Sequence, residues 1–183
     1  ANHNLVLTST ENAGLAPLGD YGGKTKTHAL KGGSQSLEAG SDSLAPALDQ
    51  RGEERPTAAG GPIADIGAFE AGNFSVLTVR TTTDRLNSTL NADELSLREA
   101  LTLADSLAGV ETVVFDASLF NAGPVTIDVT YDGPDAGAVP DALTLYRGTT
   151  LKGPRADRLT IEGTGQNRVF NVSGGASRGA VVI

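Results

Sequence analysis

The sequence predicts an all-β protein in which short strands stack on one another and a single helix caps the stack. Two observations support this expectation. Several short runs rich in β-branched or aromatic residues are bounded by Gly, Pro, Asp and Asn, which is the pattern of strands separated by tight turns. Aromatic residues make up only 4% of the 183-residue chain and there are 23 glycines. Such a composition suits a solenoid, which buries its core by stacking rather than with large side chains.

The capping helix is predicted to begin at Ser96. Ser96 and Glu99 have the spacing of a capping box, in which each side chain accepts a hydrogen bond from the other residue's backbone N–H. The helix should run to about Ala108, where Gly109 can end it in a left-handed conformation. Its apolar stripe consists of Leu97, Leu101, Leu103, Ala104, Leu107 and Ala108.

The expected strands are too short to be stable alone, so we expect them to pack together. Leu101, Phe115, Ile127, Ile161 and Phe170 are predicted to lie in one buried stack. The strands themselves are expected at residues 4–8, 74–79, 112–115, 125–129, 143–145, 159–161, 168–172 and 180–183.

Residues 95–100 read Leu-Ser-Leu-Arg-Glu-Ala, and residues 112–116 and 168–172 follow as Thr-Val-Val-Phe-Asp and Arg-Val-Phe-Asn-Val. This series resembles the N-terminal region of bacterial surface proteins that carry a C-S-L-R-E-A signature, with Leu95 in place of the usual Cys. The resemblance implies a right-handed parallel β-helix, a solenoid, with a short capping α-helix.

The first third of the chain resembles the opposite end of such proteins. Residues 17–40 are followed by Asp-Gln-Arg-Gly at 49–52 and Asp-Ile-Gly-Ala-Phe-Glu at 65–70. This order is similar to the tails that close β-helices in choice-of-anchor surface proteins. The resemblance implies that residues 1–70 close one β-helical unit and that residues 71–183 hold the N-terminal cap and first coils of the next.

A closing motif that precedes an opening motif suggests an internal piece of a longer, repetitive polypeptide. The partners expected are therefore further β-helical units, reached by covalent continuation or by head-to-tail self-association into a fibre. Residues 30–70 lack a helical or strand period, so they form either an ordered, irregular wrap or a flexible linker. We expect the ordered wrap, with Ile63, Ile66 and Phe69 as apolar anchors.

Charge and composition exclude several classes of partner. The formal net charge of −8 opposes non-specific binding to nucleic acid and to anionic membrane surfaces. No apolar run approaches the roughly 20 residues that span a bilayer. There is no Cys, so neither disulfides nor thiolate metal sites can form.

Calcium is the one cofactor for which the sequence offers candidate ligands. Asp132, Asp135 and Asp141 lie in a Gly- and Pro-rich loop, and calcium prefers clustered oxygen ligands. Their spacing matches no EF-hand, and a solvated structural turn is the alternative. The two histidines, His3 and His28, lack the spacing of a zinc site.

No catalytic motif is complete, so the sequence predicts a non-enzymatic protein with no catalytic residues. Together with the resemblance, this favours a structural or adhesive segment of an extracellular or bacterial cell-surface protein. The alternatives are a polysaccharide lyase or hydrolase and a non-catalytic module that binds cell-surface glycans, because carbohydrate-active enzymes also use parallel β-helices.

Overall fold

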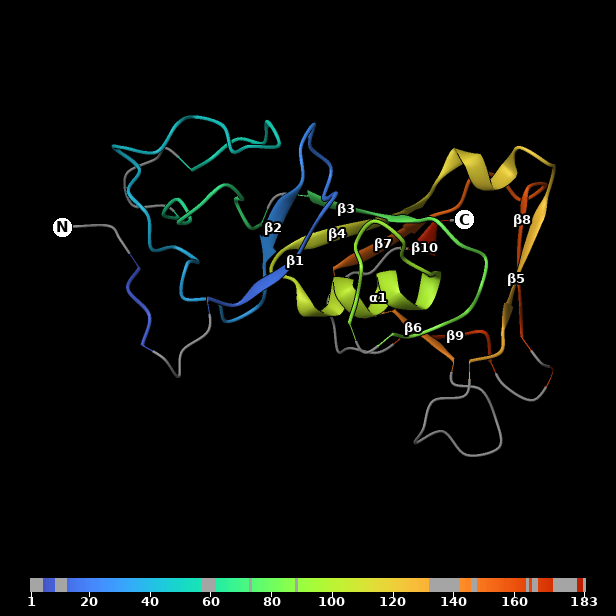
Figure 1. The fold of residues 1–183 in the computed structure, drawn as a ribbon. Coiled ribbons are helices and arrows are strands. Elements are labelled where there is room, and N and C mark those ends of the chain that lie inside the picture. Colours follow the sequence, from blue (N-terminus) through green and yellow to red (C-terminus); the bar gives the residue numbers. More distant parts are fainter. Residues whose placement is uncertain are drawn as a thin grey trace. The chain divides into compact units, whose positions relative to one another are not determined.

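The computed structural model describes residues 5–8, 13–56, 62–72, 74–87, 89–131, 142–145, 148–163, 165, 168–172 and 181–182 (Figure 1). These residues belong to two compact units. Unit 1 consists of Ala1–Ser75 with Ser106–Val110, and unit 2 consists of Val76–Asp105 with Glu111–Ile183. Each unit is described by itself below.

Unit 1 contains one antiparallel hairpin and much irregular backbone. Strands β1 (Leu15–Gly19) and β2 (Thr27–Leu30) pair with Leu18 opposite His28. The irregular part is nevertheless tightly packed, because the Gly40 N–H donates to the Ala64 carbonyl at 2.7 Å. A Cβ at Gly40 would lie 2.4 Å from that oxygen, so only glycine fits there. The buried apolar side chains of unit 1 include Ala16, Tyr21, Ala29, Leu30, Ala64 and Phe69.

The largest sheet has the strand order β10-β7-β4-β3. It is formed by β3 (Phe74–Val79), β4 (Val110–Phe115), β7 (Thr149–Lys152) and β10 (Val181–Val182). Strand β7 lies parallel to both β4 and β10, with Val113 and Val181 each paired with Leu151. The Leu77, Val79, Val113 and Leu151 side chains of this sheet are buried.

Two further sheets in unit 2 are parallel pairs. Strand β5 (Val125–Val129) pairs with β8 (Leu159–Gly163), and β6 (Leu143–Leu145) pairs with β9 (Phe170–Val172). The strands β4, β5 and β6 thus pair, in chain order, with β7, β8 and β9. A short 3-10 helix, η1 (Ala117–Phe120), lies between β4 and β5.

Helix α1 (Leu97–Ser106) confirms the predicted capping box. The Ser96 N–H donates to Glu99 Oε2 at 2.9 Å, and the Glu99 N–H donates to Ser96 Oγ at 3.1 Å. The helix ends two residues earlier than expected, and Gly109 follows with a φ of +124°. The buried Leu97, Leu101 and Leu103 form its apolar face.

The expectation of an all-β, right-handed parallel β-helix is wrong. The described strands form one four-stranded and three two-stranded sheets, and these do not join into a closed or solenoid sheet. Strands β1 and β2 are antiparallel, and α1 adds a helix of 10 residues, so the fold is mixed α/β. The physical reason is that the described strands are only two to six residues long and most are followed at once by a polar residue or glycine, so each sheet stays small.

Three smaller expectations also need correction. Leu101 and Ile127 are buried, but Phe115, Ile161 and Phe170 are only half-buried, and their strands belong to three different sheets. Residues 5–8 lie outside any strand. The described part of residues 30–70 is ordered by hydrogen bonds, as expected, and Phe69 is buried. Ile63, however, is 43% exposed and does not anchor it.

Candidate functional site

The most unusual feature of unit 1 is a set of acidic side chains that accept hydrogen bonds from backbone N–H groups far away in the sequence. We call this set the carboxylate network. It contains Glu38, Asp42, Asp49, Asp65 and Glu70, together with the guanidinium groups of Arg51 and Arg55. A carboxylate that accepts backbone N–H groups can order chain that has no sheet or helix partner.

Asp49 ties three parts of the backbone together. Its Oδ1 accepts the N–H groups of Arg51 at 2.7 Å and Glu53 at 3.1 Å. Its Oδ2 accepts the N–H of Glu70 at 3.0 Å and pairs with Arg51 Nη2 at 2.8 Å. Burial acts to raise the pKa of Asp49, but the hydrogen bonds from Glu70 and Arg51 and the charge of Arg51 outweigh it. The pKa is therefore below its ordinary value.

Arg55 and Glu70 form a buried ion pair at 2.6 Å between Nη1 and Oε2. Arg55 also donates to the carbonyls of Asp65 at 3.2 Å and Gly67 at 2.6 Å, while Glu70 Oε2 accepts the Asp65 N–H at 3.0 Å. Burial raises the pKa of both Glu70 and Asp65, and the charge of Arg55 compensates only in part. The pair thus holds the turn at residues 65–70 closed.

The remaining contacts join residues 38–42 to residues 63–71. Glu38 Oε2 accepts the Ile63 N–H at 2.5 Å, and Asp42 Oδ1 accepts the Ala64 N–H at 2.8 Å. In return, Asp65 accepts the N–H groups of Glu38 at 2.7 Å and Ala71 at 2.6 Å. The network therefore joins residues 38–42, 49–55 and 63–71 of unit 1.

An aromatic pair packs against the network. The Arg51 guanidinium lies 3.7 Å from the centroid of the Phe69 ring, a cation–π contact. Phe69 also meets Tyr21 edge-on, with centroids 6.2 Å apart and rings at 83°. The Tyr21 hydroxyl donates to the Pro17 carbonyl at 2.8 Å. Both rings are buried, so neither offers a face on which a sugar could stack.

A cavity of about 480 Å³ borders the network and is a candidate ligand site. Its charged lining residues are Asp49, Arg55 and Asp65, and its apolar ones include Leu44 and Ile66. Both oxygens of Asp49 and of Asp65 already accept backbone N–H groups. These carboxylates therefore cannot serve as a free general base.

A second cavity of about 400 Å³ lies beside the β1–β2 hairpin and is mostly apolar. Leu15, Leu18 and Phe69 line it, as does His28, one of the two histidines. The His28 Nδ1 is 2.8 Å from the Ala16 carbonyl, so this histidine is held by its own hairpin. His3 lies outside the described residues.

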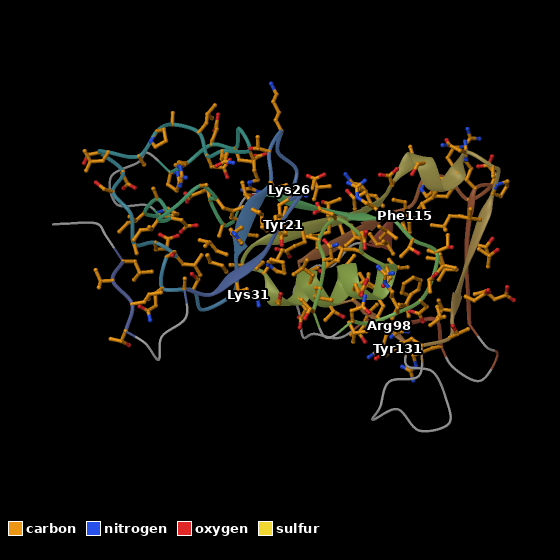
Figure 2. All side chains as sticks on the ribbon, in the orientation of Figure 1. Tyr21, Lys26, Lys31, Arg98, Phe115 and Tyr131 are labelled. Carbon is orange, nitrogen blue, oxygen red and sulfur yellow. The ribbon has the colours of Figure 1, made fainter. Side chains whose placement is uncertain are left out.

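Unit 2 holds a smaller ionic cluster around Asp84. Its two oxygens pair with Arg98 at 2.8 and 2.9 Å, and Oδ2 also accepts the N–H groups of Thr130 at 3.0 Å and Tyr131 at 2.8 Å. Arg98 lies 5.2 Å from the centroid of the Tyr131 ring, and Figure 2 shows the two side chains together. This cluster links α1 to the end of β5.

Among the acidic side chains that the structure describes, Glu111 on β4 is the one with a large pKa shift. It is 2% exposed, and its Oε1 has no hydrogen-bond partner among the described residues. Burial, with a smaller contribution from the charge of Asp105, raises the pKa of Glu111 to about 7. Because the carboxyl is shielded from solvent, it is poorly placed to act on a solute.

The proposed calcium ligands Asp132, Asp135 and Asp141 lie outside the described residues, so the calcium site stays a prediction. Within the described ranges, no three His, Asp or Glu side chains are grouped so that they could hold a metal ion. Nor does any helix in the described part of the chain have the length and apolarity needed to cross a bilayer.

Residues 49–52 and 65–70 stood out in the sequence only through their resemblance to β-helix tails. The sequence did not predict the carboxylate network. The available signal was a segment without periodicity that contains seven Asp and Glu residues and two Arg residues between positions 38 and 70. Comparisons with protein-family models, with curated proteins and with solved structures returned no match. The resemblance to β-helical surface proteins therefore stays a prediction.

Proposed function

We propose that this chain is a structural segment of an extracellular or bacterial cell-surface protein and that it is not an enzyme. The observation that carries the proposal is the state of Asp49 and Asp65 at the 480 Å³ cavity. All four oxygens of these two carboxylates accept backbone N–H groups. Hydrolysis or elimination on a polysaccharide needs carboxylates or bases that face a groove and are free to exchange protons.

The network suits a structural role because the protein's own side chains order a long irregular stretch. No ligand is needed for this. An adhesive or stalk-forming function agrees with the acidic surface and with the sequence resemblances. The partners in this proposal are further units of the same kind, joined by covalent continuation or by self-association. Cell-surface glycans are a second class of partner for an adhesive segment.

The test is a screen of the purified chain against acidic and neutral polysaccharides. New reducing ends report hydrolysis, the absorbance of unsaturated products reports lyase activity, and a parallel pull-down on immobilised polysaccharide reports binding. We expect no product from any polysaccharide. Product release by the wild-type chain would contradict the structural proposal and favour an enzyme, and its loss in a folded Asp65→Asn variant would assign the activity to the cavity.

Binding without product would favour the glycan-binding alternative over a purely structural role. The matched control for a binding signal is Asp157→Asn, because Asp157 is exposed and belongs to unit 2, whereas the carboxylate network belongs to unit 1. A signal that Asp65→Asn and Asp157→Asn lower equally is not specific to the cavity beside the network.

A further inference from the structure

Strands β8 and β9 each have one strand partner in the described structure. β8 pairs with β5 alone, and β9 pairs with β6 alone, whereas β7 has β4 on one side and β10 on the other. Because β4, β5 and β6 pair in order with β7, β8 and β9, the second edges of β8 and β9 lie on the β10 side. β10 shows that this side accepts a parallel strand.

Among the described residues, the backbone of β8 has no strand partner at that edge. The Val125 N–H donates to the Arg158 carbonyl at 2.9 Å, which fixes the ladder between β5 and β8. In a parallel ladder, alternate residues face opposite neighbours, so Thr160 and Glu162 bond toward β5. The N–H and C=O of Ile161 therefore point to the second edge of β8, where they can pair with another strand.

The opposite side of unit 2 is covered. Strand β3 pairs with β4, and Val79 forms a bridge with Leu95 just before α1. Asp84 accepts the N–H groups of Thr130 and Tyr131 where β5 ends. On the β3 side, β4 and the end of β5 are therefore already contacted, whereas β10 shows a strand added on the other side.

Residues 5–7 are a strand-forming segment that is not in a strand. They read Leu-Val-Leu, a sequence of high β-propensity, yet residues 5–8 have no regular structure. Val6 is 85% exposed, the largest exposed fraction among the large apolar side chains of the described residues. An exposed apolar segment of this kind gains stability by joining a sheet edge.

We propose that residues 5–7 of one copy of this chain pair as an added strand with the free edge of β8 of a second copy. The inference rests on the proposed structural role, because it supplies the contact by which such segments associate. The donor segment and the receiving edge are different surfaces. The contact is therefore heterologous, and its repetition gives a linear, head-to-tail assembly unless it closes into a ring.

The first test measures association of the full chain by analytical ultracentrifugation over a range of concentrations. Val6→Pro and Leu7→Pro are tested separately, because only alternate residues of an added strand donate to β8. We expect at least one of them to raise the dissociation constant about tenfold or more, because proline removes a ladder donor. Val6→Thr keeps the N–H and the β-branched shape, and it should change the dissociation constant less than about threefold.

The second test uses the absence of cysteine from the chain. A chain carrying Val6→Cys is mixed with a chain carrying Thr160→Cys and treated with a short bis-maleimide cross-linker, so that a mixed product forms only between copies. Ser118→Cys on η1, an exposed site outside β8, replaces Thr160→Cys in the control. We expect the Thr160→Cys pairing to give at least about fivefold more mixed product, because binding raises the local concentration.

Three results would overturn the inference: a chain that stays monomeric at all concentrations, association that neither proline variant weakens, or equal cross-linking at Thr160→Cys and Ser118→Cys. None of them bears on the polysaccharide screen. Product release in that screen would reject the structural role and leave the pairing between copies standing, so the two failures are distinguishable.

Discussion

Units 1 and 2 reach ordered structures by different means. Unit 1 has one hairpin, and its irregular backbone is fixed by charged side chains such as Asp49, Asp65 and Glu70. Unit 2 has three sheets and a helix, and its interior is mostly aliphatic. The difference shows that carboxylates can replace a sheet as the acceptors of backbone N–H groups.

The comparison predicts that unit 1 is the more sensitive to the loss of a single charge. Arg55→Met removes the donor to Glu70 and to the Asp65 and Gly67 carbonyls, so it should lower the free energy of unfolding by about 3–5 kcal/mol. Chemical denaturation followed by circular dichroism measures the change. Arg155→Met is the matched control, because the Arg155–Asp157 pair is exposed, and its effect should stay within about 0.5 kcal/mol. Equal effects of the two substitutions would contradict a structural role for the buried pair.

In unit 2, Glu111 gives the clearest expected dependence of the free energy of unfolding on pH. Its pKa is raised from 4.5 to about 7, so the folded chain binds the proton more tightly than the unfolded chain does. The stabilisation is complete below pH 4.5 and is lost as the pH rises through 7. The loss amounts to about 3 kcal/mol at 1.36 kcal/mol for each unit of pKa.

Glu111→Gln should remove this dependence, because the amide stays neutral at every pH. Denaturation curves recorded at several pH values between 4 and 9 measure it, with Glu162→Gln on an exposed position of β8 as the control. If the unfolding free energy of the wild-type chain depended on pH in the same way as that of Glu111→Gln, the pKa of Glu111 would not be raised by burial.

The helix cap in unit 2 gives a smaller expected effect. Ser96→Ala removes the acceptor of the Glu99 N–H and the donor to the Arg85 carbonyl, at 3.1 and 2.7 Å. The free energy of unfolding should fall by about 1–2 kcal/mol. Thr83→Ala, at an exposed site, is the control for thermal denaturation. No difference between the two variants would mean that the capping box adds nothing to stability.

The smallest expected effect belongs to the aromatic pair of unit 1. Tyr21→Phe keeps the edge-on contact with Phe69 and removes only the hydrogen bond to the Pro17 carbonyl. A loss of about 1 kcal/mol in the free energy of unfolding follows from one neutral hydrogen bond. A loss above the Ser96→Ala value would indicate that the hydroxyl has a further role.

The sequence predicted local structure well where the signal is local. The expected strands at 125–129 and 143–145 coincide with β5 and β6, and the capping box forms as predicted. How the strands combine into sheets could not be predicted from such local signals. Whether β5–β8 and β6–β9 join one sheet depends on backbone geometry at the turns, and the half-buried Phe170 shows that the stack expected from its apolar character does not form.

There is a physical reason why the sequence did not predict the carboxylate network. The partners of Asp49 and Asp65 are backbone N–H groups, which every residue except proline carries, so no pair of residue types marks the contact. The Asp49–Glu70 hydrogen bond joins positions 21 residues apart. Only the sequence of Asp, Glu and Arg in a segment without periodicity indicated that side chains would have to order it.

The parallel pairs β5–β8 and β6–β9 have a consequence for how this chain can be altered. Residues 130–142 connect β5 to β6, while the shorter stretch 164–169 connects β8 to β9, and both routes lead into strands that pair in register. Pairing therefore does not fix the length of the connection. In the loop-closure estimate, doubling the length of a connection costs only about 0.6 kcal/mol. A peptide, an epitope or a small domain inserted between β5 and β6, beyond the Tyr131 N–H that Asp84 holds, should therefore leave the paired strands unchanged.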